Sequence, residues 1–371
     1  MGSPRRRLPL CALPLCSLSL CAPLALLLVA ARPAAAGGYQ VTNLVSNTPG
    51  VAAATDPNLV NPWGISASPS GPFWVSNNGT NTSTLYNTAN TPIGLVVSTP
   101  TQDPKLGPTG QVFNGSADFG GKNFLFASED GTLSGWKGGA DGTQAVVVAS
   151  GAAHNADYTG IAIANHELFA ANIAGGGLDV FNSTFGAVAT ITDSNANGSS
   201  PFNVQNVGGT LYVTYTGKGG DFLDSLDPNT FAFTRLATGG ALHGAWGLAQ
   251  APASFGAFGG DLLVGNFFNG AINAYDKAGA FQGAMTDANG SAIVIPGLWS
   301  LTAGNGGAGG AASSVYFAAG GPTETSGLFG RLDPAAPVPE ASTTVSLGLL
   351  LALGGVAVTA RRKKAAKNTA E

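Results

Sequence analysis

The chain is poor in cysteine, and the few cysteines lie close to its start. All three, Cys11, Cys16 and Cys21, fall within the first 36 of 371 residues. The remainder of the chain therefore has no disulfide framework and no thiol chemistry, although the N-terminal leader predicts export to a compartment that permits disulfides.

Signatures of catalysis and of nucleotide binding are missing as well. No Gly-x-Ser-x-Gly nucleophile elbow occurs, and His166-Glu167 lacks the second His of a zinc-binding helix. Gly217-Lys218 continues into Gly219-Gly220 instead of the Ser or Thr of a phosphate-binding loop, which indicates a turn. The Gly/Ala run at 304–312 has no strand-to-helix context and predicts a flexible loop. We assign no catalytic and no cofactor-binding residue from the sequence.

Positive charge is scarce between residues 37 and 337, where 7 Lys and Arg stand against 18 Asp and Glu. Such a domain repels phosphate backbones, which excludes a nucleic-acid platform. The acidity is typical of a soluble extracellular domain that stays dispersed. Attraction of divalent cations or of cationic polymers is the alternative explanation.

Helical periodicity is rare too, because 55 Gly and 22 Pro interrupt the chain and few apolar runs keep a 3.6-residue period. The chain instead repeats a three-part motif six times between residues 61 and 333. Each copy has an opening strand, a stronger apolar strand and a third strand that usually begins with Gly. The openings are Pro62-Trp63-Gly64-Ile65, Gly110-Gln111-Val112-Phe113, Tyr158-Thr159-Gly160-Ile161, Pro201-Phe202-Asn203-Val204, Ala245-Trp246-Gly247-Leu248 and Leu298-Trp299-Ser300-Leu301.

Successive openings are 43 to 53 residues apart, which is the length of one four-stranded sheet with its loops. The sequence therefore predicts an all-β fold, a β-propeller of six four-stranded blades over residues 37–335. The last copy ends near Asp333 without an outer strand, whereas Tyr39 to Val45 precedes the first opening. We expect this N-terminal strand to complete the last blade and close the ring. A β-sandwich or a β-helix of the same composition is the alternative.

Two flanking segments stand outside this domain. Residues 1–36 carry Arg5-Arg6-Arg7, an apolar stretch and Ala34-Ala35-Ala36, the pattern of a signal peptide with a small-residue cleavage site. Residues 336–371 include an uncharged 18-residue segment, 343–360, followed by Arg361-Arg362-Lys363-Lys364. This pattern predicts a C-terminal membrane anchor with the basic cluster in the cytoplasm and the globular domain outside.

The C-terminal tail resembles a bacterial sorting signal. Val338-Pro339-Glu340-Ala341-Ser342, the apolar segment and the basic cluster are together similar to the PEP-CTERM tail. The resemblance implies processing by exosortase in a bacterial host. Ala341 stands where that family usually has a second Pro, and a plain membrane anchor is the alternative.

The body of the chain resembles a family of secreted, functionally uncharacterised six-bladed propeller-like proteins, many of which carry PEP-CTERM tails. The resemblance implies the fold and a place at the cell envelope or outside the cell, and it brings no activity. It rests on Asn61-Pro62-Trp63-Gly64-Ile65, Phe73-Trp74-Val75-Ser76-Asn77-Asn78-Gly79-Thr80, Leu262-Leu263-Val264-Gly265-Asn266-Phe267, Ala271-Ile272-Asn273-Ala274-Tyr275-Asp276, Gly297-Leu298-Trp299 and Gly327-Leu328-Phe329-Gly330.

Polar side chains recur just past the second strands of the repeats. If these loops share one face of the ring, their oxygens converge on the central channel, where Ca²⁺ would take six to eight oxygen ligands. The alternative is that Asn and Asp cap turns by bonding to their own backbone. The candidate metal ligands are Asn77, Glu129, Asn172 and Asn266, with Asn203 inside a blade opening.

Loops that enter the innermost strands reach the same channel mouth. They carry His154 and His243, each a candidate acid or base or else a structural loop residue, and Glu324 lies in a loop before a third strand. Trp63, Trp246 and Trp299 occupy equivalent positions, which favours packing between blades over sugar stacking. For Trp74 and Trp136 we expect partial exposure.

These observations predict an exported binding or scaffold module at the cell envelope or in its matrix. Its ring face and channel mouth would take a glycan, peptide or protein partner. The alternative is a metal-dependent, lactonase-like hydrolase with a Ca²⁺-like ion in the central channel. A purely structural matrix role is the third possibility.

Overall fold

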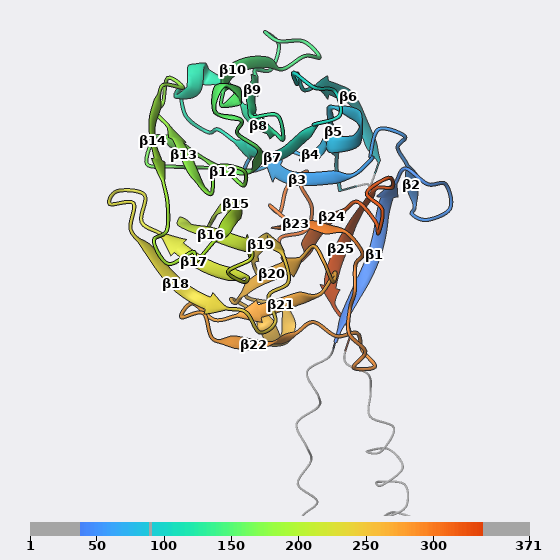
Figure 1. The fold of residues 1–371 in the computed structure, drawn as a ribbon. Helices are drawn as coiled ribbons and strands as arrows, with labels where there is room; N and C mark the ends of the chain where they lie inside the picture. Colours follow the sequence, from blue (N-terminus) through green and yellow to red (C-terminus); the bar gives the residue numbers. More distant parts are fainter. Residues whose placement is uncertain (1–37, 89–90, 337–371) are drawn as a thin grey trace, which may run out of the picture. The chain divides into compact units, whose positions relative to one another are not determined.

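The computed structural model describes residues 38–88 and 91–336. These residues form six sheets arranged around a common centre (Figure 1), five with four strands and one with five. The predicted six-bladed, all-β propeller is therefore confirmed. The predicted signal peptide, the motif at 338–342, the apolar segment 343–360 and the basic cluster lie outside the described residues.

Each of the first five blades is a meander of four consecutive strands. Blade I contains β3 (Pro62–Ala67), β4 (Phe73–Asn77), β5 (Thr82–Tyr86) and β6 (Pro92–Ser98). Blade II contains β7 (Pro108–Phe113), β8 (Phe124–Ser128), β9 (Thr132–Trp136) and β10 (Val146–Ser150). Blade III contains β11 (Tyr158–Ala164), β12 (Glu167–Asn172), β13 (Gly177–Phe181) and β14 (Ala187–Ile191). Blade IV contains β15 (Ser199–Val207), β16 (Thr210–Gly217), β17 (Phe222–Leu226) and β18 (Phe233–Thr238), and blade V contains β19 (Ala245–Gln250), β20 (Leu262–Asn266), β21 (Ile272–Tyr275) and β22 (Phe281–Ala284).

Blade VI is built from both ends of the domain. Its strands β23 (Leu298–Ala303), β24 (Val315–Ala319) and β25 (Leu328–Pro334) are completed by β1 (Tyr39–Ser46), which pairs antiparallel with β25. The short strand β2 (Ala54–Thr55) adds to β1 in parallel. The prediction that the N-terminal strand closes the ring is confirmed, and the closure removes the edge that β25 would otherwise expose.

The helices of the described residues are four single 3₁₀ turns, at Asn78–Thr80, Phe119–Gly121, Ala152–His154 and Gly256–Phe258. In this part of the chain no helix has the length and hydropathy needed to cross a bilayer.

The first strands of the six blades stand next to one another in a closed ring around the channel. All six begin at one face of the ring, here called the N-face, where the loops between the second and third strands also lie. They end at the opposite face, the C-face. Close approach of neighbouring inner strands requires glycine, because a Cβ on Gly247 would lie 2.5 Å from the carbonyl oxygen of Trp299. Side chains add to these contacts, as where Asn203 Nδ2 donates to the carbonyl oxygen of Trp246 at 2.7 Å.

Apolar side chains pack between adjacent blades. Trp74 and Trp136 belong to one such cluster, and their side chains are 4% and 8% exposed. The expectation that both are partly exposed is therefore wrong. Trp74 stacks on Phe124 with ring centroids 4.1 Å apart, because both face the gap between blades I and II.

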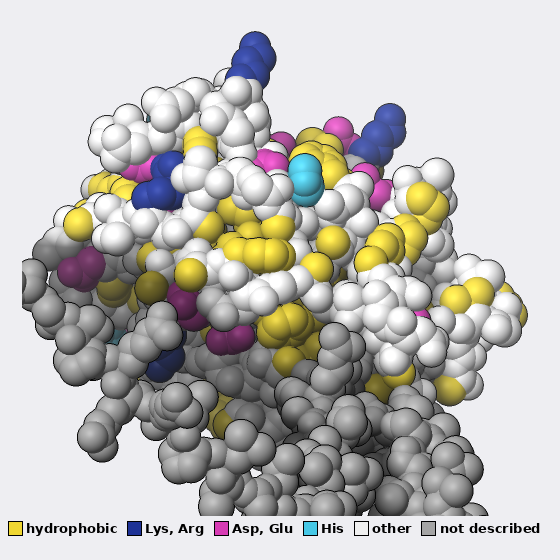
Figure 2. Space-filling view, turned by 90° about the horizontal axis from the view of Figure 1, so that it is seen from below, with side chains coloured by type: hydrophobic (Ala, Val, Ile, Leu, Met, Phe, Trp, Pro, Cys, Tyr) yellow, Lys and Arg dark blue, Asp and Glu magenta, His cyan; other side chains and the backbone are white. Residues whose placement is uncertain are grey.

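The described surface carries few charges. Figure 2 shows the molecule from below, with Lys and Arg scattered among mostly uncharged atoms wherever grey atoms do not cover the view. This agrees with a chain in which charged residues make up 10%.

Candidate functional site

Four aromatic side chains from the blade openings meet inside the ring, and we call them the aromatic cluster: Trp63, Phe202, Trp246 and Trp299. Trp63 and Trp299 stack with ring centroids 3.5 Å apart. The indole Nε1–H of Trp246, in blade V, donates to the carbonyl oxygen of Thr159 in blade III at 3.0 Å. The predicted packing role is confirmed, but these side chains pack on one another within the ring rather than in the gaps between blades.

A polar network lies next to this cluster at the N-face. The indole Nε1–H of Trp299 donates to Asn61 Oδ1 at 3.0 Å. Asn61 Nδ2 is within reach of two acceptors, Glu324 Oε2 at 3.1 Å and Asn78 Oδ1 at 3.4 Å. Asn78 Nδ2 in turn donates to Glu129 Oε2 at 2.8 Å. The network thus connects the aromatic cluster to two carboxylates from blades II and VI.

A third carboxylate, Asp157, lies just before β11 and completes what we call the N-face mouth: Asn61, Asn78, Glu129, Asp157 and Glu324. The backbone N–H of Asp157 donates to Asn172 Oδ1 at 3.2 Å, which fixes this loop. The Oδ1 atom of Asp157 is buried and has no hydrogen-bond partner among the described residues. The mouth therefore holds a carboxylate oxygen that is both removed from water and unpaired.

Burial raises the pKa of both inner carboxyls. The pKa of Glu129 rises to about 7 because the side chain is desolvated, and the charges of Asp157 and Glu324 add to this. The hydrogen bond from Asn78 opposes the rise without cancelling it. Desolvation alone raises the pKa of Asp157 to about 6.

Basic side chains do not compensate these charges. The ion pairs of the described residues involve Lys122, His166, Arg235 and Arg331, and none of them reaches a carboxylate of the N-face mouth. Removing carboxylates from water without a counter-charge is costly. The carboxylates of the mouth therefore have no basic partner within the described chain.

The structure brings together only part of the predicted metal set. Glu129 lies in the mouth, and Asn172 supports it through Asp157. Asn77 donates to Thr82 and Thr84 within its own blade, while Asn266 Nδ2 donates to the carbonyl oxygen of Ala241. Asn203 lines a separate space near the C-face, described below. Within the described ranges, no three His, Cys, Asp or Glu side chains are grouped to hold one metal ion.

Of the predicted channel-mouth residues, Glu324 is part of the N-face mouth. His154 and His243 lie in N-face loops with exposed side chains. The side chain of neither histidine bonds to the mouth carboxylates of the described chain. His243 contributes its backbone N–H, which donates to Asn266 Oδ1 at 3.2 Å.

Sequence reasoning missed Asn61 and Asp157, although their position carried a signal. Each directly precedes an inner strand. In later blades, this position is occupied by Gly198, Gly244 and Gly297, all of which have positive φ. Asn61 adopts the same left-handed conformation, with φ of 44°. Asparagine tolerates this conformation better than most residues, so the break in the glycine pattern marks the position, and the role of the side chain follows only from its contacts.

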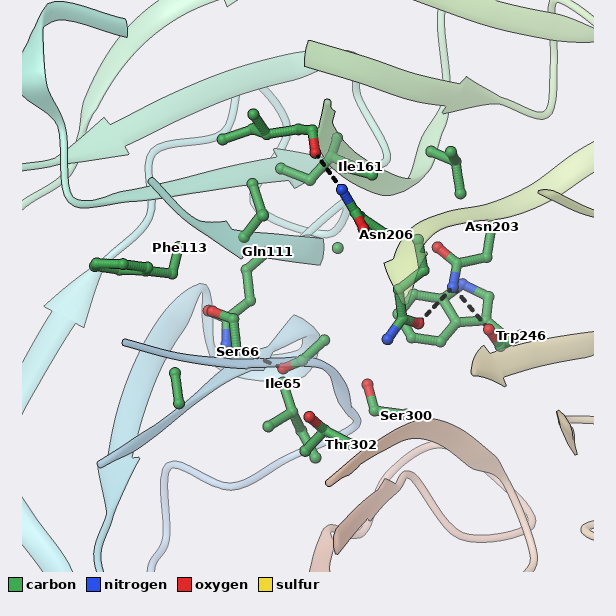
Figure 3. A pocket seen from close by; sticks show the side chains of 18 residues that line it. Ile65, Ser66, Gln111, Phe113, Ile161, Asn203, Asn206, Trp246, Ser300 and Thr302 are labelled. Atoms are coloured by element: carbon green, nitrogen blue, oxygen red, sulfur yellow. Dashed lines mark hydrogen bonds between the residues drawn. The ribbon is translucent and has the colours of Figure 1, made fainter. Parts of the chain in front are cut away.

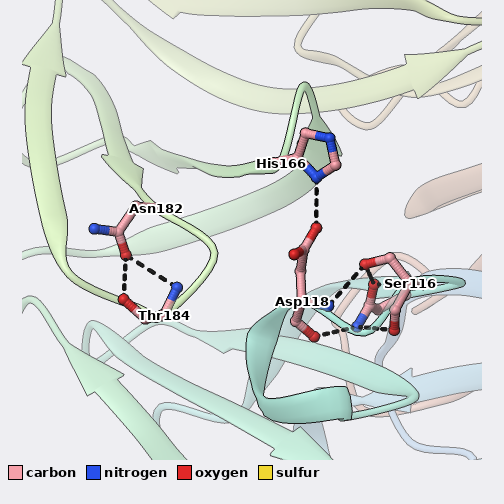
Figure 4. Close-up of polar contacts among 6 residues, drawn as sticks. Ser116, Asp118, His166, Asn182 and Thr184 are labelled. Atoms are coloured by element: carbon pink, nitrogen blue, oxygen red, sulfur yellow. Dashed lines mark hydrogen bonds and ion pairs between the residues drawn. The ribbon is translucent and has the colours of Figure 1, made fainter.

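A further polar pair lies on the C-face and does not form a hydrolytic triad (Figure 4). His166 sits in a two-residue hairpin turn, and its Nδ1 is 2.7 Å from Asp118 Oδ2. This bond lowers the pKa of Asp118. Ser116 Oγ accepts from the Asp118 backbone and donates to Asn114 Oδ1, so it is not aligned with the imidazole. The pair is exposed and we assign it no catalytic role.

Comparisons with known proteins agree with the fold and name no activity for the chain. No family model matches it. It is 28% identical over 295 residues to an uncharacterized protein of Acanthamoeba polyphaga mimivirus, covering 71% of this chain and 73% of that protein. Among solved structures, a glucose dehydrogenase-type oxidoreductase of Thermus thermophilus aligns with a TM-score of 0.52 at 12% identity, over 80% of this chain and 100% of that one. A streptogramin B lyase aligns with a TM-score of 0.51 at 12% identity, over 80% and 98%. Likeness at this level shows the fold alone.

Proposed function

We propose that the protein is an exported binding module, associated with the cell envelope or its matrix, whose N-face mouth takes a basic segment of a peptide or protein partner. The observation that carries this proposal is the gathering of Glu129, Asp157 and Glu324 without a basic partner in the described chain. A ligand cation would restore the interactions that these carboxylates lose on burial.

The surroundings of the mouth favour an arginine or lysine side chain over a small ion. Glu324 borders a hollow of about 360 Å³ on the N-face that Phe267 and Phe268 also line. Phe268 is 65% exposed, which is unusual for so large an apolar side chain. An aromatic face beside a carboxylate suits a guanidinium or ammonium group on an apolar stem.

The separation of the three carboxylates also favours a basic side chain over a small ion. They come from the β8–β9 loop, the loop before β11 and the β24–β25 loop, and two of them are joined only through Asn78 and Asn61. Such spacing fits several contacts along a polar segment better than the close shell that one ion requires. This arrangement of carboxylates therefore fits a basic peptide better than a single ion.

The binding test is a calorimetric titration of the full chain with a short arginine-containing peptide and its citrulline analogue, which has the same shape without the charge. We expect binding of the arginine peptide alone. Glu129→Gln and Glu324→Gln should each weaken it about tenfold, because each removes one charge from the mouth. Glu167→Gln is the matched control, since Glu167 begins β12 at the C-face. Equal affinities for both peptides, or for all variants, would refute the proposal.

The export part of the proposal rests on the leader and tail patterns of residues 1–36 and 336–371. Protease added to intact cells should digest the propeller domain if it lies outside the membrane. Full protection, with digestion only after lysis, would place the domain inside the cell and remove this part of the proposal while leaving the binding test unaffected.

A metal-dependent hydrolase is the second candidate, and Asp157 favours it. Its buried, unpaired Oδ1 is an oxygen that a hard cation would accept as a ligand. With a pKa of about 7, Glu129 is suited to act as a general base near neutral pH. The test is a metal analysis of the full chain with melting curves in EDTA and in added Ca²⁺. A stoichiometric ion whose removal lowers Tm would support this candidate, and no ion with no shift would eliminate it.

A further inference from the structure

The channel contains a second site, at the C-face, which we call the C-face cavity. It is a space of about 380 Å³, open on one side and lined by residues from the inner strands of all six blades (Figure 3). Trp246 of the aromatic cluster is among its walls, so the cavity ends where that cluster begins. It is therefore separate from the N-face mouth, and ligands would enter it from the opposite face of the ring.

No ionisable side chain lines this cavity. Its polar groups are hydroxyls and carboxamides, which alternate with apolar walls such as Ile65, Val112 and Ile161. A charged ligand would lose its hydration here without meeting an opposite charge, which is unfavourable. The lining therefore selects against ions and for a neutral molecule with hydrogen-bonding groups.

Several of the polar groups already hold the blades together. Asn206 Nδ2 donates to the carbonyl oxygen of Ile163 at 3.0 Å, and Ser300 Oγ donates to the carbonyl oxygen of Trp63. Asn203 makes a similar bond to the backbone of blade V. These bonds make the wall rigid, which lowers the entropic cost of ordering it around a ligand.

Other groups keep free hydrogen-bonding capacity. Thr302 lies on the inner strand β23, and no hydrogen bond engages its hydroxyl within the described chain. Ser66 Oγ also lacks a partner among the described residues, but it is closed off from solvent and therefore from a ligand. Across the cavity, Gln205 uses one amide hydrogen for the carbonyl oxygen of Leu248 at 2.7 Å and keeps the other. Donors and acceptors thus remain on two sides of the same space.

We propose that the C-face cavity binds a neutral polyhydroxylated ligand of monosaccharide size. Sugar hydroxyls donate and accept at once, which matches Thr302 and Gln205, while the C–H faces of a sugar ring suit the isoleucine and valine walls. The cavity volume falls in the range of about 300–1,000 Å³ that is typical of small-molecule pockets.

The test is an NMR titration of the full chain, labelled at isoleucine methyl groups, with glucose, galactose, N-acetylglucosamine and myo-inositol. Ile65, Ile161 and Ile163 line the cavity, whereas Ile272 is buried in a different cluster. We expect at least one compound to shift the three cavity methyls saturably without shifting Ile272. No saturable shift with any compound would overturn the proposal.

Variants locate the binding. Replacing Thr302→Val removes a cavity hydroxyl with little change of shape and should weaken binding about tenfold. Thr234→Val is the matched control, because Thr234 is exposed on the outer strand β18. The methyl spectrum also reports whether each variant is folded. Affinity unchanged in a folded Thr302→Val variant would contradict the assigned site.

Discussion

Asn61 connects two parts of the molecule at the level of single atoms. Its Oδ1 accepts from the buried indole of Trp299, and its Nδ2 faces Glu324 and Asn78. Its backbone is left-handed, a conformation that asparagine tolerates better than most residues. One side chain therefore positions the carboxylate network relative to the aromatic cluster.

Replacing Asn61 tests this role. Asn61→Ala should lower the free energy of unfolding by about 1–3 kcal/mol, because it leaves the Trp299 indole N–H buried and unpaired. Asn61→Gly loses the same bonds but relieves the left-handed backbone, so it should be less destabilised than the alanine variant. Urea unfolding monitored by tryptophan fluorescence measures both. Wild-type stability in Asn61→Ala would show that the network is not structural.

The raised pKa values of Glu129 and Asp157 predict a pH dependence with a definite sign. Their folded-state pKa values, about 7 and about 6, exceed the ordinary values of 4.5 and 3.8. Between the ordinary and the raised pKa of each group, the folded state therefore binds more protons than the unfolded state. Stability should therefore rise as pH falls from about 8 to about 5, while peptide binding weakens as the mouth loses charge.

Comparison with Glu129→Gln isolates this effect. The variant cannot titrate at this position, so the difference in unfolding free energy between it and the wild type should shrink as the pH falls through about 7. Asp118 and Asp141 have lowered pKa values through bonds from His166 and Lys122, so they act only in more acidic solution. A difference that does not change with pH would contradict the burial of Glu129.

At the scale of elements, β1 makes the ring continuous. It joins residues 39–46 to the last blade, and its buried side chains enter the clusters beside blade VI. Pairing between the two ends of the domain converts an open array of sheets into a closed one. The stability of the propeller should therefore depend on a strand far from the rest of its blade in sequence.

Two valines of β1 provide a matched pair. Val45 is fully buried, whereas Val41 is 38% exposed on the same strand. Val45→Ala should cost about 2 kcal/mol through the cavity it leaves, and Val41→Ala should cost much less. Thermal unfolding by circular dichroism compares them. Equal Tm values for the two variants would mean that β1 does not pack into the ring as described.

Individual elements also show what a single sequence can predict. The inner strands are predictable from the repeated openings, because Tyr158, Ala245 and Leu298 each begin an opening in the sequence and begin β11, β19 and β23 in the structure. Trp74 was misjudged, since blade packing covers both faces of a sheet and alternation does not reveal it. Local pattern identifies a strand, while its burial depends on the neighbouring blade.

For the whole molecule, blade number and ring closure were predictable because the repeat period and the unpaired N-terminal strand are properties of the chain as written. The N-face mouth was predictable only in part. Glu129 and Glu324 are separated by 195 residues in sequence and meet only through ring closure and the side chains of Asn61 and Asn78. A contact between residues so far apart in sequence can be identified only from the three-dimensional structure.

The central claim, that the N-face mouth binds a cationic ligand, is tested most directly by the indole N–H signals of the full chain, which has five tryptophans. Trp299 reports on the mouth through Asn61, whereas Trp136 donates to the carbonyl oxygen of Gly142 at 2.9 Å, away from it. The account predicts that an arginine peptide shifts the Trp299 signal saturably and leaves Trp136 unchanged, while the citrulline peptide shifts neither. A Trp299 signal that stays fixed in an excess of the arginine peptide would contradict it.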